Sequence, residues 1–559
     1  MYKLIVIAIA LICPGSFALF ENVGAETLSK QVRQYLRNRI DAPGTPQIIL
    51  VEGEPIYSSA MLLHFYERRT FQPVWSDDKG PLPQADALTN EIRQADREGL
   101  RPNDYHLDKI ETILNDVHKK QIEKKLLNPS ELADLDLLLT DAFLTFSSHL
   151  LAGCTNPELF DSKRYTDPRE SNLVLVLETA LSSNKIEEVL RNLLPSNPAY
   201  TRLRQALMRY REIAATGGWH VVPYGSTIRA GDRGERVETL RTRLIAEGYL
   251  DQKPIRNKDL LDDDLEQAVR AFQKRHGLEV DGAVGPATLG ALNVSAQERV
   301  RQIEIHMERW RLLPHNLGQR YVIVNVPSFQ LYVVEDGQII MTMNAVVGQL
   351  YWRTPVFSTK MTYLVLNPSW NIPRSIAIQE VVPIIRKNPG YLTEHKIRVF
   401  QGSGAKTQRI DPKTIDWSKV SARNFRYRFR QDPGPKNPLG RVKFMFPNEF
   451  NVYIHDTPSQ ELFSKTERCF SHGCIRIEKP IDLAEYVLRS DPRWTREKIL
   501  SEIETGKEKV VPLPEPIPVY ILYLTAWVDE EGTVQFRKDL YGHDRETNED
   551  FCENPYTMQ

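Results

Sequence analysis

Cysteine is scarce in this chain: five residues among 559, too few for a fold held together by disulfides. Neither sign of charge is in surplus, since 72 Lys and Arg face 73 Asp and Glu, so the composition gives no overall attraction to nucleic acid. With 41% hydrophobic and 26% charged residues, the chain is neither collagen-like nor a disordered tail nor a membrane protein with many spans. Its length predicts about three to four domains.

The first 25 residues have the pattern of a secretory signal peptide. Lys3 precedes an unbroken apolar run over Leu4–Ile12, and Pro14 and Gly15 then interrupt it. Small residues allow cleavage after Ala18 or after Ala25. The alternative is an uncleaved anchor over residues 4–20, which the Pro-Gly break disfavours. No later segment resembles a membrane span, so we expect an exported protein without a stable span after cleavage.

Two helical regions are expected before residue 300. Residues 26–216 are predicted to be mainly helical, with apolar side chains at helical spacing in stretches such as 132–144. Gly217-Gly218 marks a boundary. Residues 225–293 then carry three short helices, each ended or opened by glycine, which predicts a small bundle. Its segment 265–292 resembles the peptidoglycan-binding domain of bacterial cell-wall enzymes, whereas the helical spacing by itself indicates only the bundle.

From Tyr321 the hydrophobic period changes to two, which predicts strands. We expect strands at 321–326, 330–335 and 338–347, with a type I′ turn at Asp336-Gly337. A further hairpin is expected near the C-terminus, from strands at 519–529 and 533–540. The pattern therefore predicts a mainly β domain that begins near residue 321 and is completed by this hairpin, which packs on it from a C-terminal extension, 501–559. The fold class is multidomain α+β.

A basic insertion interrupts the predicted β domain. Residues 401–441 contain ten Lys and Arg but only three Asp, a net charge of +7. Such a segment is either a solvated loop or a lid over an acidic ligand. Because it comes just before the candidate site, we favour the lid.

The candidate site combines a histidine with a cysteine motif. Tyr453 and His455 alternate with apolar residues and share one strand face, and Ser471-His472-Gly473-Cys474 follows after a loop. A neutral imidazole can accept the proton of a thiol, and Gly473 lets backbone N–H groups approach an oxyanion. Arg476 is placed to hold a carboxylate. The residues alone leave three readings open for this cluster: a nucleophile, a disulfide such as Cys469–Cys474, or a zinc site.

This motif resembles the signature of the YkuD family of L,D-transpeptidases. That signature is a His, a loop, then Ser or Thr, His-Gly-Cys, an apolar residue, and Arg or Asn, and residues 455–476 match each position. Residues 321–500 resemble the catalytic domain, and segments 440–448, 455–458 and 367–373 resemble the large periplasmic members, which carry a peptidoglycan-binding domain and a helical scaffold. Cys469, close to the nucleophile, is the one departure.

The resemblance implies a peptidoglycan L,D-transpeptidase in the periplasm that needs no metal or organic cofactor. Its catalytic residues would be Cys474 as nucleophile and His455 as proton carrier, oriented by the Asp456 carbonyl, with His472 and Gly473 beside them. Substrate-binding candidates follow: Arg476, Tyr453, Ser471, Trp370. Expected partners are stem peptides and glycan, with other cell-wall synthesis enzymes as further candidates and no nucleic acid. Alternatives are an L,D-carboxypeptidase, an enzyme that attaches envelope proteins, or a non-catalytic wall-binding protein.

Overall fold

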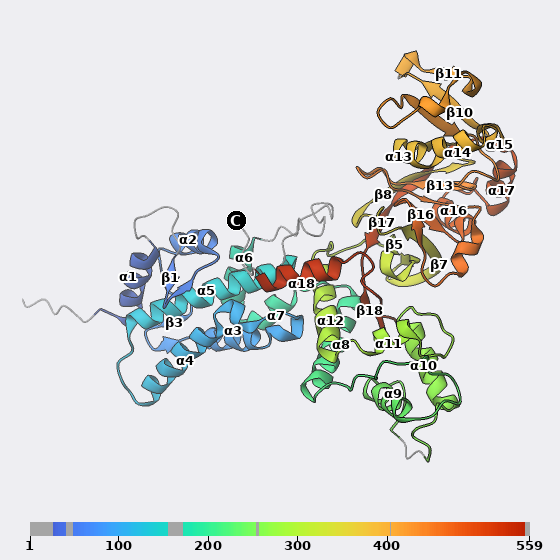
Figure 1. Cartoon of the computed structure of the whole chain (residues 1–559). Coiled ribbons are helices and arrows are strands. Elements are labelled where there is room, and N and C mark those ends of the chain that lie inside the picture. Colours follow the sequence, from blue (N-terminus) through green and yellow to red (C-terminus); the bar gives the residue numbers. More distant parts are fainter. Residues whose placement is uncertain (1–25, 41–48, 155–171, 253–255, 403, 554–559) are drawn as a thin grey trace, which may run out of the picture. The chain divides into compact units, whose positions relative to one another are not determined.

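A computed structural model describes residues 26–40, 49–154, 172–252, 256–402 and 404–553 (Figure 1). The expected signal peptide lies outside the described residues. The chain divides into two compact units, one made of residues up to 89 with 108–142, and one made of residues 90–107 with everything from 143 onward. The expected α+β architecture of helical regions followed by a mainly β domain is confirmed.

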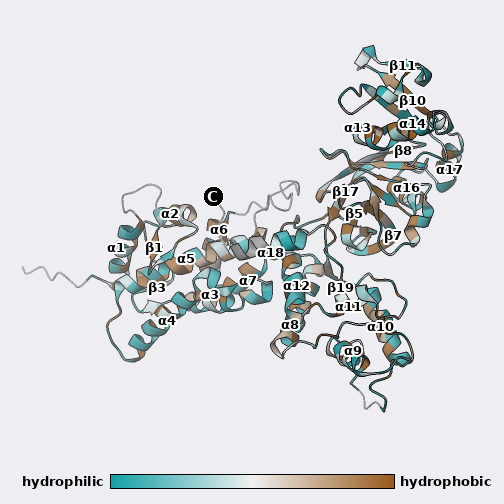
Figure 2. Cartoon of the chain, in the orientation of Figure 1, coloured by the Kyte–Doolittle hydropathy of each residue, from teal (hydrophilic) through white to brown (hydrophobic). Residues whose placement is uncertain are grey.

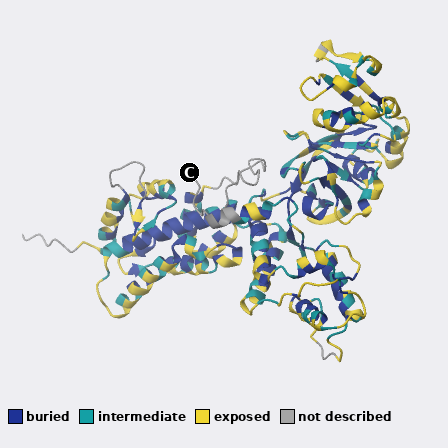
Figure 3. Ribbon diagram, viewed as in Figure 1, coloured by how far each residue is buried: buried dark blue, intermediate teal, exposed yellow. Residues whose placement is uncertain are grey.

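The first unit is helical, with two short hairpins. Its elements are α1 (Leu28–Ile40), β1 (Leu50–Val51), β2 (Glu54–Pro55), α2 (Ser59–Arg68), β3 (Ser76–Asp77), β4 (Gly80–Pro81), most of α3 (Pro83–Arg93) and of α4 (Leu107–Ile122), and the first half of α5 (Pro129–Ala152). Helix α5 is long and apolar enough to cross a membrane, but 89% of its apolar window is buried in the protein (Figures 2 and 3). Its buried Asp136 accepts hydrogen bonds from Tyr66 and from the Val74 and Trp75 N–H groups. These contacts are typical of a core helix.

In the second unit, helices precede and support the sheet. They are α6 (Leu173–Ser183), α7 (Ile186–Arg191), α8 (Pro198–Ala215) and α12 (Ala296–Arg311). The buried Arg311 forms a 2.8 Å ion pair with Glu308 and donates to the Glu98 carbonyl and the Tyr200 hydroxyl. Side chains of α8 and α12 share an apolar core with Tyr520 of the main sheet and with Phe536 from further along the chain.

The small bundle forms as expected from three helices, α9 (Glu235–Ala246), α10 (Asp263–Arg275) and α11 (Pro286–Leu292). Its core includes Leu240, Leu244, Val269, Phe272 and Leu289. The predicted apolar stripes therefore face one another, because residues at i, i+3, i+4 and i+7 lie on one helix face.

The β domain is built on a nine-stranded sheet of order β15-β7-β16-β14-β13-β8-β17-β5-β6, in yellow to red in Figure 1. Strand β6 also pairs with β7, so the sheet closes on itself with β15 outside the ring. The strands are β5 (Arg320–Asn325), β6 (Gln330–Glu335), β7 (Gln338–Gly348), β8 (Phe357–Leu366), β13 (Val442–Met445), β14 (Ile454–His455), β15 (Cys469–Ser471), β16 (Ile475–Ile477) and β17 (Lys509–Leu522). Helices α16 (Pro480–Leu488) and α17 (Arg496–Glu504) follow β16. The expected Asp336-Gly337 turn joins β6 to β7 with both residues at positive φ.

The C-terminal part differs from the expectation. Residues 519–522 belong to β17, which pairs with β8 and runs parallel to β5 within the main sheet. The prediction of one hairpin strand over 519–529 is therefore wrong. The hairpin itself is shorter and consists of β18 (Ala526–Val528) and β19 (Val534–Phe536). A domain boundary at residue 500 would separate β17 from the main sheet, although β17 pairs with β8 on one side and with β5 on the other. Helix α18 (His543–Glu553), which the sequence analysis did not predict, ends the described chain.

The basic segment is part of a folded insertion, not a free lid. An insertion domain, residues 370–431, connects the neighbouring strands β8 and β13. It has a sheet of order β11-β10-β12-β9 and its own apolar core around Val399 and Phe429. Its elements are β9 (Trp370–Ile372), α13 (Arg374–Ile376), a π-helical turn (Ala377–Val381), α14 (Val382–Lys387), α15 (Tyr391–Glu394), β10 (Ile397–Gln401), β11 (Gln408–Ile410) and β12 (Tyr427–Gln431). The lid expected over 401–441 therefore begins about 30 residues too late, because β12 pairs with β10 on one side and with β9 on the other.

Candidate active site

Three neighbouring strands bring the candidate residues onto one face of the sheet. In the register, His455 of β14 lies opposite Lys443 of β13 on one side and Arg476 of β16 on the other. The Ile475 N–H donates to the Tyr453 carbonyl at 3.0 Å, which sets Cys474 beside Tyr453. Residues two apart on a strand share a face, so all these side chains project to the same side.

His455 is buried and held in one tautomer. His455 is only 4% exposed, and its Nδ1 lies 2.6 Å from the Asp456 carbonyl oxygen. Because a carbonyl only accepts, Nδ1 carries the hydrogen and Nε2 is left as the basic nitrogen. Burial, with a further contribution from Arg476, lowers the pKa of His455 to about 3. The imidazole is therefore neutral at pH 7 and can take a proton.

Cys474 is a half-buried thiol surrounded by donors and cations. Burial raises the pKa of its thiol, whereas hydrogen bonds from the Tyr453 N–H and hydroxyl act in the opposite direction, as do the charges of Lys443 and Arg476. The Lys443 ammonium lies 3.7 Å from the centre of the Tyr453 ring. Tyr453 is in turn hydrogen-bonded to Trp370, so β9 of the insertion domain reaches the site. The arrangement holds a protonated thiol at rest and stabilises the thiolate once it forms.

The turn before Cys474 is ordered by its own residues. The Ser471 hydroxyl donates to the Cys474 carbonyl at 2.5 Å and accepts from the Gly473 N–H at 3.1 Å. Ser471 is 2% exposed, and its two hydrogen bonds shape the turn. Gly473 has a φ of 106°, a conformation that side-chain-bearing residues rarely adopt.

His472 points away from the turn toward two other segments. Its Nε2 lies 2.6 Å from a carboxylate oxygen of Glu380, in the π-helical turn of the insertion domain. Its ring centre is 4.3 Å from that of Trp352. Since a carboxylate only accepts, Nε2 donates to Glu380 and Nδ1 remains available.

Sequence reasoning missed three residues that contact this site: Lys443, Trp352 and Glu380. Lys443 carries one signal, a charged side chain between buried Val442 and Phe444 on a strand. Pairing between β13 and β14 brings Lys443 next to His455, and the local sequence pattern does not predict which strands pair. Glu380 and Trp352 follow no pattern that links them to Cys474.

The two competing readings of the cysteine motif find no support in the geometry. Cys469 and Cys474 are both free thiols, as is Cys154. Among the described residues, no group of three or more His, Cys, Asp or Glu side chains is placed to hold a metal ion.

Three family models match the chain. Residues 319–511 match the L,D-transpeptidase catalytic domain (YkuD), residues 233–292 a "Putative peptidoglycan binding domain", and residues 60–207 a scaffold domain. The first model ends inside β17, so it covers most of the main sheet.

Known proteins resemble parts of the chain. A "Putative L,D-transpeptidase" of Haemophilus influenzae is 34% identical over 250 residues, which is 44% of this chain and 49% of the relative, so the match spans about half of that protein. The N-acetylmuramoyl-L-alanine amidase CwlM of Mycobacterium tuberculosis is 47% identical over 75 residues, 12% of this chain and 18% of the relative. The crystal structure of an L,D-transpeptidase from Xylanimonas cellulosilytica matches over 54% of this chain and 99% of its own, at 17% identity and a TM-score of 0.16.

Proposed function

We propose that this chain, whose residues 319–511 are an L,D-transpeptidase catalytic domain, cross-links peptidoglycan stem peptides through a thioester on Cys474. The observation that carries the proposal is the strand register, in which His455 lies opposite Arg476. Cys474 comes two residues before Arg476 on the same face, so it lies diagonally across from His455. A step of two residues is about 7 Å along a strand, which is within reach of a thiol and an imidazole on neighbouring strands.

In the first half-reaction, Nε2 of His455 takes the Cys474 proton and the thiolate attacks the carbonyl carbon of the third stem residue. The C–N bond to the terminal D-Ala breaks, and the imidazolium returns its proton to the leaving amine. A thioester on Cys474 remains. The buried, neutral His455 supports this role, because a ring that is uncharged at pH 7 is ready to accept a proton.

In the second half-reaction, the side-chain amine of another stem attacks the thioester. His455 takes a proton from that amine, the new amide forms and the sulfur leaves, taking up a proton to restore the thiol. Water as acceptor would make the enzyme an L,D-carboxypeptidase, and a protein lysine would make it attach envelope proteins to the wall. Acceptor choice depends on the shape of the cleft around Cys474, and the family match favours the stem amine.

Mass spectrometry of the purified protein with a disaccharide-tetrapeptide tests this proposal. We expect an acyl-enzyme, cross-linked dimer and released D-Ala. Tripeptide without dimer would indicate the carboxypeptidase instead. A protein that takes up no acyl group would contradict all three enzymatic functions and leave a non-catalytic wall-binding protein.

Arg476 is proposed to bind a carboxylate of the donor stem. Its side chain is half-buried and lies opposite His455 in the strand register, which places the guanidinium beside the proposed base. We expect Arg476→Gln to raise KM for the donor by about 10- to 100-fold with a smaller change in kcat, because a charged hydrogen bond is lost. Steady-state kinetics would measure the split. The exposed Arg493→Gln serves as control, and an unchanged KM in Arg476→Gln would contradict the assignment.

The basic insertion domain is proposed to attract the anionic stem. Replacing the exposed residues Arg409, Arg423 and Arg426 together by Gln should raise KM for muropeptide several-fold at low salt. The difference should vanish near 0.5 M NaCl, because ions screen exposed charges over a few ångströms. Acylation by a small uncharged substrate should not change. An effect that persists at high salt would mean that these residues shape the site itself.

We further propose that the bundle at 225–293 binds the cell wall weakly and that the protein works in the periplasm. The family model over residues 233–292 supports peptidoglycan as its ligand. The residues of its apolar stripe are buried in the bundle core, so a ligand would have to contact its loops. Weak binding by such a domain raises the local concentration of stem peptides around the catalytic domain.

A further inference from the structure

One loop touches every residue of the turn that precedes the nucleophile. In the loop 349–354, the Gln349 N–H donates to the Ser471 carbonyl at 3.0 Å, and the Trp352 ring packs against His472. The Thr354 hydroxyl donates to the Gly473 carbonyl at 2.9 Å. The Arg353 carbonyl would lie 3.4 Å from a Cβ built on Gly473, so the loop backbone runs directly over this glycine.

The base of that loop is held by a residue far along the chain. The Tyr541 hydroxyl donates to the Gly348 carbonyl at 2.6 Å and accepts from the Thr354 N–H at 3.3 Å, so one oxygen bridges the two ends of the loop. The Gly348 N–H closes the arrangement by donating to the Thr354 hydroxyl at 2.9 Å. Tyr541 is 3% exposed and Thr354 fully buried. Tyr541 lies beyond residue 511, where the match to the catalytic domain ends.

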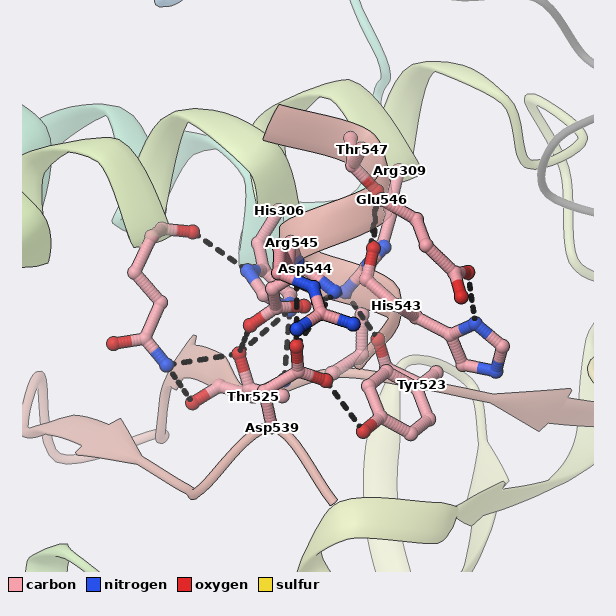
Figure 4. A network of polar contacts seen from close by, with 12 residues as sticks. His306, Arg309, Tyr523, Thr525, Asp539, His543, Asp544, Arg545, Glu546 and Thr547 are labelled. Carbon is pink, nitrogen blue, oxygen red and sulfur yellow. Dashed lines mark hydrogen bonds and ion pairs between the residues drawn. The ribbon is translucent and has the colours of Figure 1, made fainter. Parts of the chain in front are cut away.

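Tyr541 is itself fixed from several sides. Its N–H donates to the Tyr523 hydroxyl at 2.6 Å, and that hydroxyl donates to Asp539 at 2.7 Å. Figure 4 shows the network beside it, in which Asp544 pairs with Arg309 of α12 and accepts from Thr525. The segment that carries Tyr541 is therefore attached to both the sheet and α12.

Peptide geometry connects Tyr541 to catalysis. The peptide between Gly473 and Cys474 is planar, so its C=O and N–H point in opposite directions. The bond from Thr354 fixes the Gly473 C=O and with it the direction of the Cys474 N–H. Under the proposed function, that N–H is a donor to the oxyanion that forms when the thiolate attacks a carbonyl.

We propose that Tyr541 is a positioning residue that, through Thr354, aims the Cys474 N–H at the developing oxyanion. The proposal rests on the proposed function. It gives the C-terminal segment an indirect role in the reaction, because Tyr541 acts through Thr354 and not by contact with the substrate. An oxyanion exists only after attack, so the effect should appear in the rate of acylation and not in substrate affinity.

The test compares Tyr541→Phe with Tyr520→Phe, a matched control. Tyr520 is also buried, and its hydroxyl likewise donates to a backbone carbonyl, that of Leu317, at 3.0 Å. We expect both variants to lose a few degrees of Tm. Only Tyr541→Phe should slow acylation of Cys474 by the donor tetrapeptide, by about 10-fold at saturating donor with an unchanged half-saturating concentration.

Alkylation by iodoacetamide separates aim from thiol reactivity. In that reaction the sulfur displaces iodide from a saturated carbon, and no oxyanion forms. Tyr541→Phe should therefore be alkylated at the wild-type rate across the pH range. Thr354→Ser, which keeps the hydroxyl, should acylate like wild type, and Thr354→Val should be at least as slow as Tyr541→Phe.

Two results would overturn the proposal on its own: wild-type acylation in Tyr541→Phe, or alkylation slowed as much as acylation. Failure of the wild-type protein to be acylated at all would instead overturn the proposed function, and the proposal would fall with it. If Tyr541→Phe does not fold, as judged by circular dichroism, the two Thr354 variants decide the test. Slow acylation in Thr354→Ser would then contradict the proposal.

Discussion

Replacing Cys474 by Ala is expected to reduce acyl transfer by about 10⁴-fold or more, because the change removes the sulfur on which the proposed thioester forms. The variant should remain folded, since the loss of one sulfur atom leaves the strands of the site paired as before. Product analysis with the donor tetrapeptide would measure the loss, and circular dichroism would check the fold.

Cys469→Ala is the matched control for this variant. Cys469 is a free thiol five residues earlier, on β15, and burial raises its pKa. A carbapenem should add its mass to the wild-type protein and to Cys469→Ala but not to Cys474→Ala, since a thiolate opens strained amides of this kind. An adduct on Cys474→Ala, or retention of most of its activity, would rule out the thioester mechanism.

Acidification should strongly destabilise the unit that contains residues 143–559. Burial lowers the pKa of four of its histidines, to about 3 for His276 and His455 and to about 4 for His149 and His306. In the unfolded chain these rings take up protons near pH 6.5, whereas in the folded protein they remain neutral. Stability is therefore complete above about pH 7.5 and falls as the pH drops through 6.5 toward 4.

The size of the effect follows from the number of rings. Each buried neutral histidine costs about 1.4 kcal/mol per pH unit below 6.5, so the four together remove about 8 kcal/mol at pH 5. Burial raises the pKa of Asp134 and Asp136 to about 6, which acts in the opposite direction. Those carboxyl groups bind protons in the folded state between pH 6 and 4, which adds about 3 kcal/mol to the free energy of unfolding at pH 5. Both belong to the first unit, so they do not offset the loss in the second.

Pulse proteolysis in urea at pH 7.5 and pH 5.0, with the fragments identified by mass, would follow the two units separately. Cleavage within residues 172–548 should begin at much lower urea at pH 5.0. Cleavage within 49–89 and 108–142 should begin at the same or higher urea. Equal urea midpoints at the two pH values for the second unit would mean that its histidines are not held neutral by burial.

Much of the fold could be predicted because its signals are local. The bundle at 225–293 follows from apolar spacing and glycine stops, and β5, β6 and β7 follow from alternation together with the Asp336-Gly337 turn. Strand β17 could not be placed in this way. Its sequence contains four prolines, and its neighbours β8 and β5 lie about 150 and 190 residues earlier, so no local pattern tells where it pairs.

By itself, the sequence determined which residues carry the proposed chemistry: His455, the motif at 471–474, and Arg476. Their spacing is a property of the chain, and a positive φ at Gly473 is available because glycine stands there. Only the tertiary structure decided what surrounds them. Lys443 reaches His455 through strand pairing, Glu380 meets His472 from the insertion domain, and Tyr541 holds the loop over Gly473 from beyond the matched domain. The physical reason is that pairing and packing join residues by their positions in space, and the energies that select those partners are not contained in any short segment.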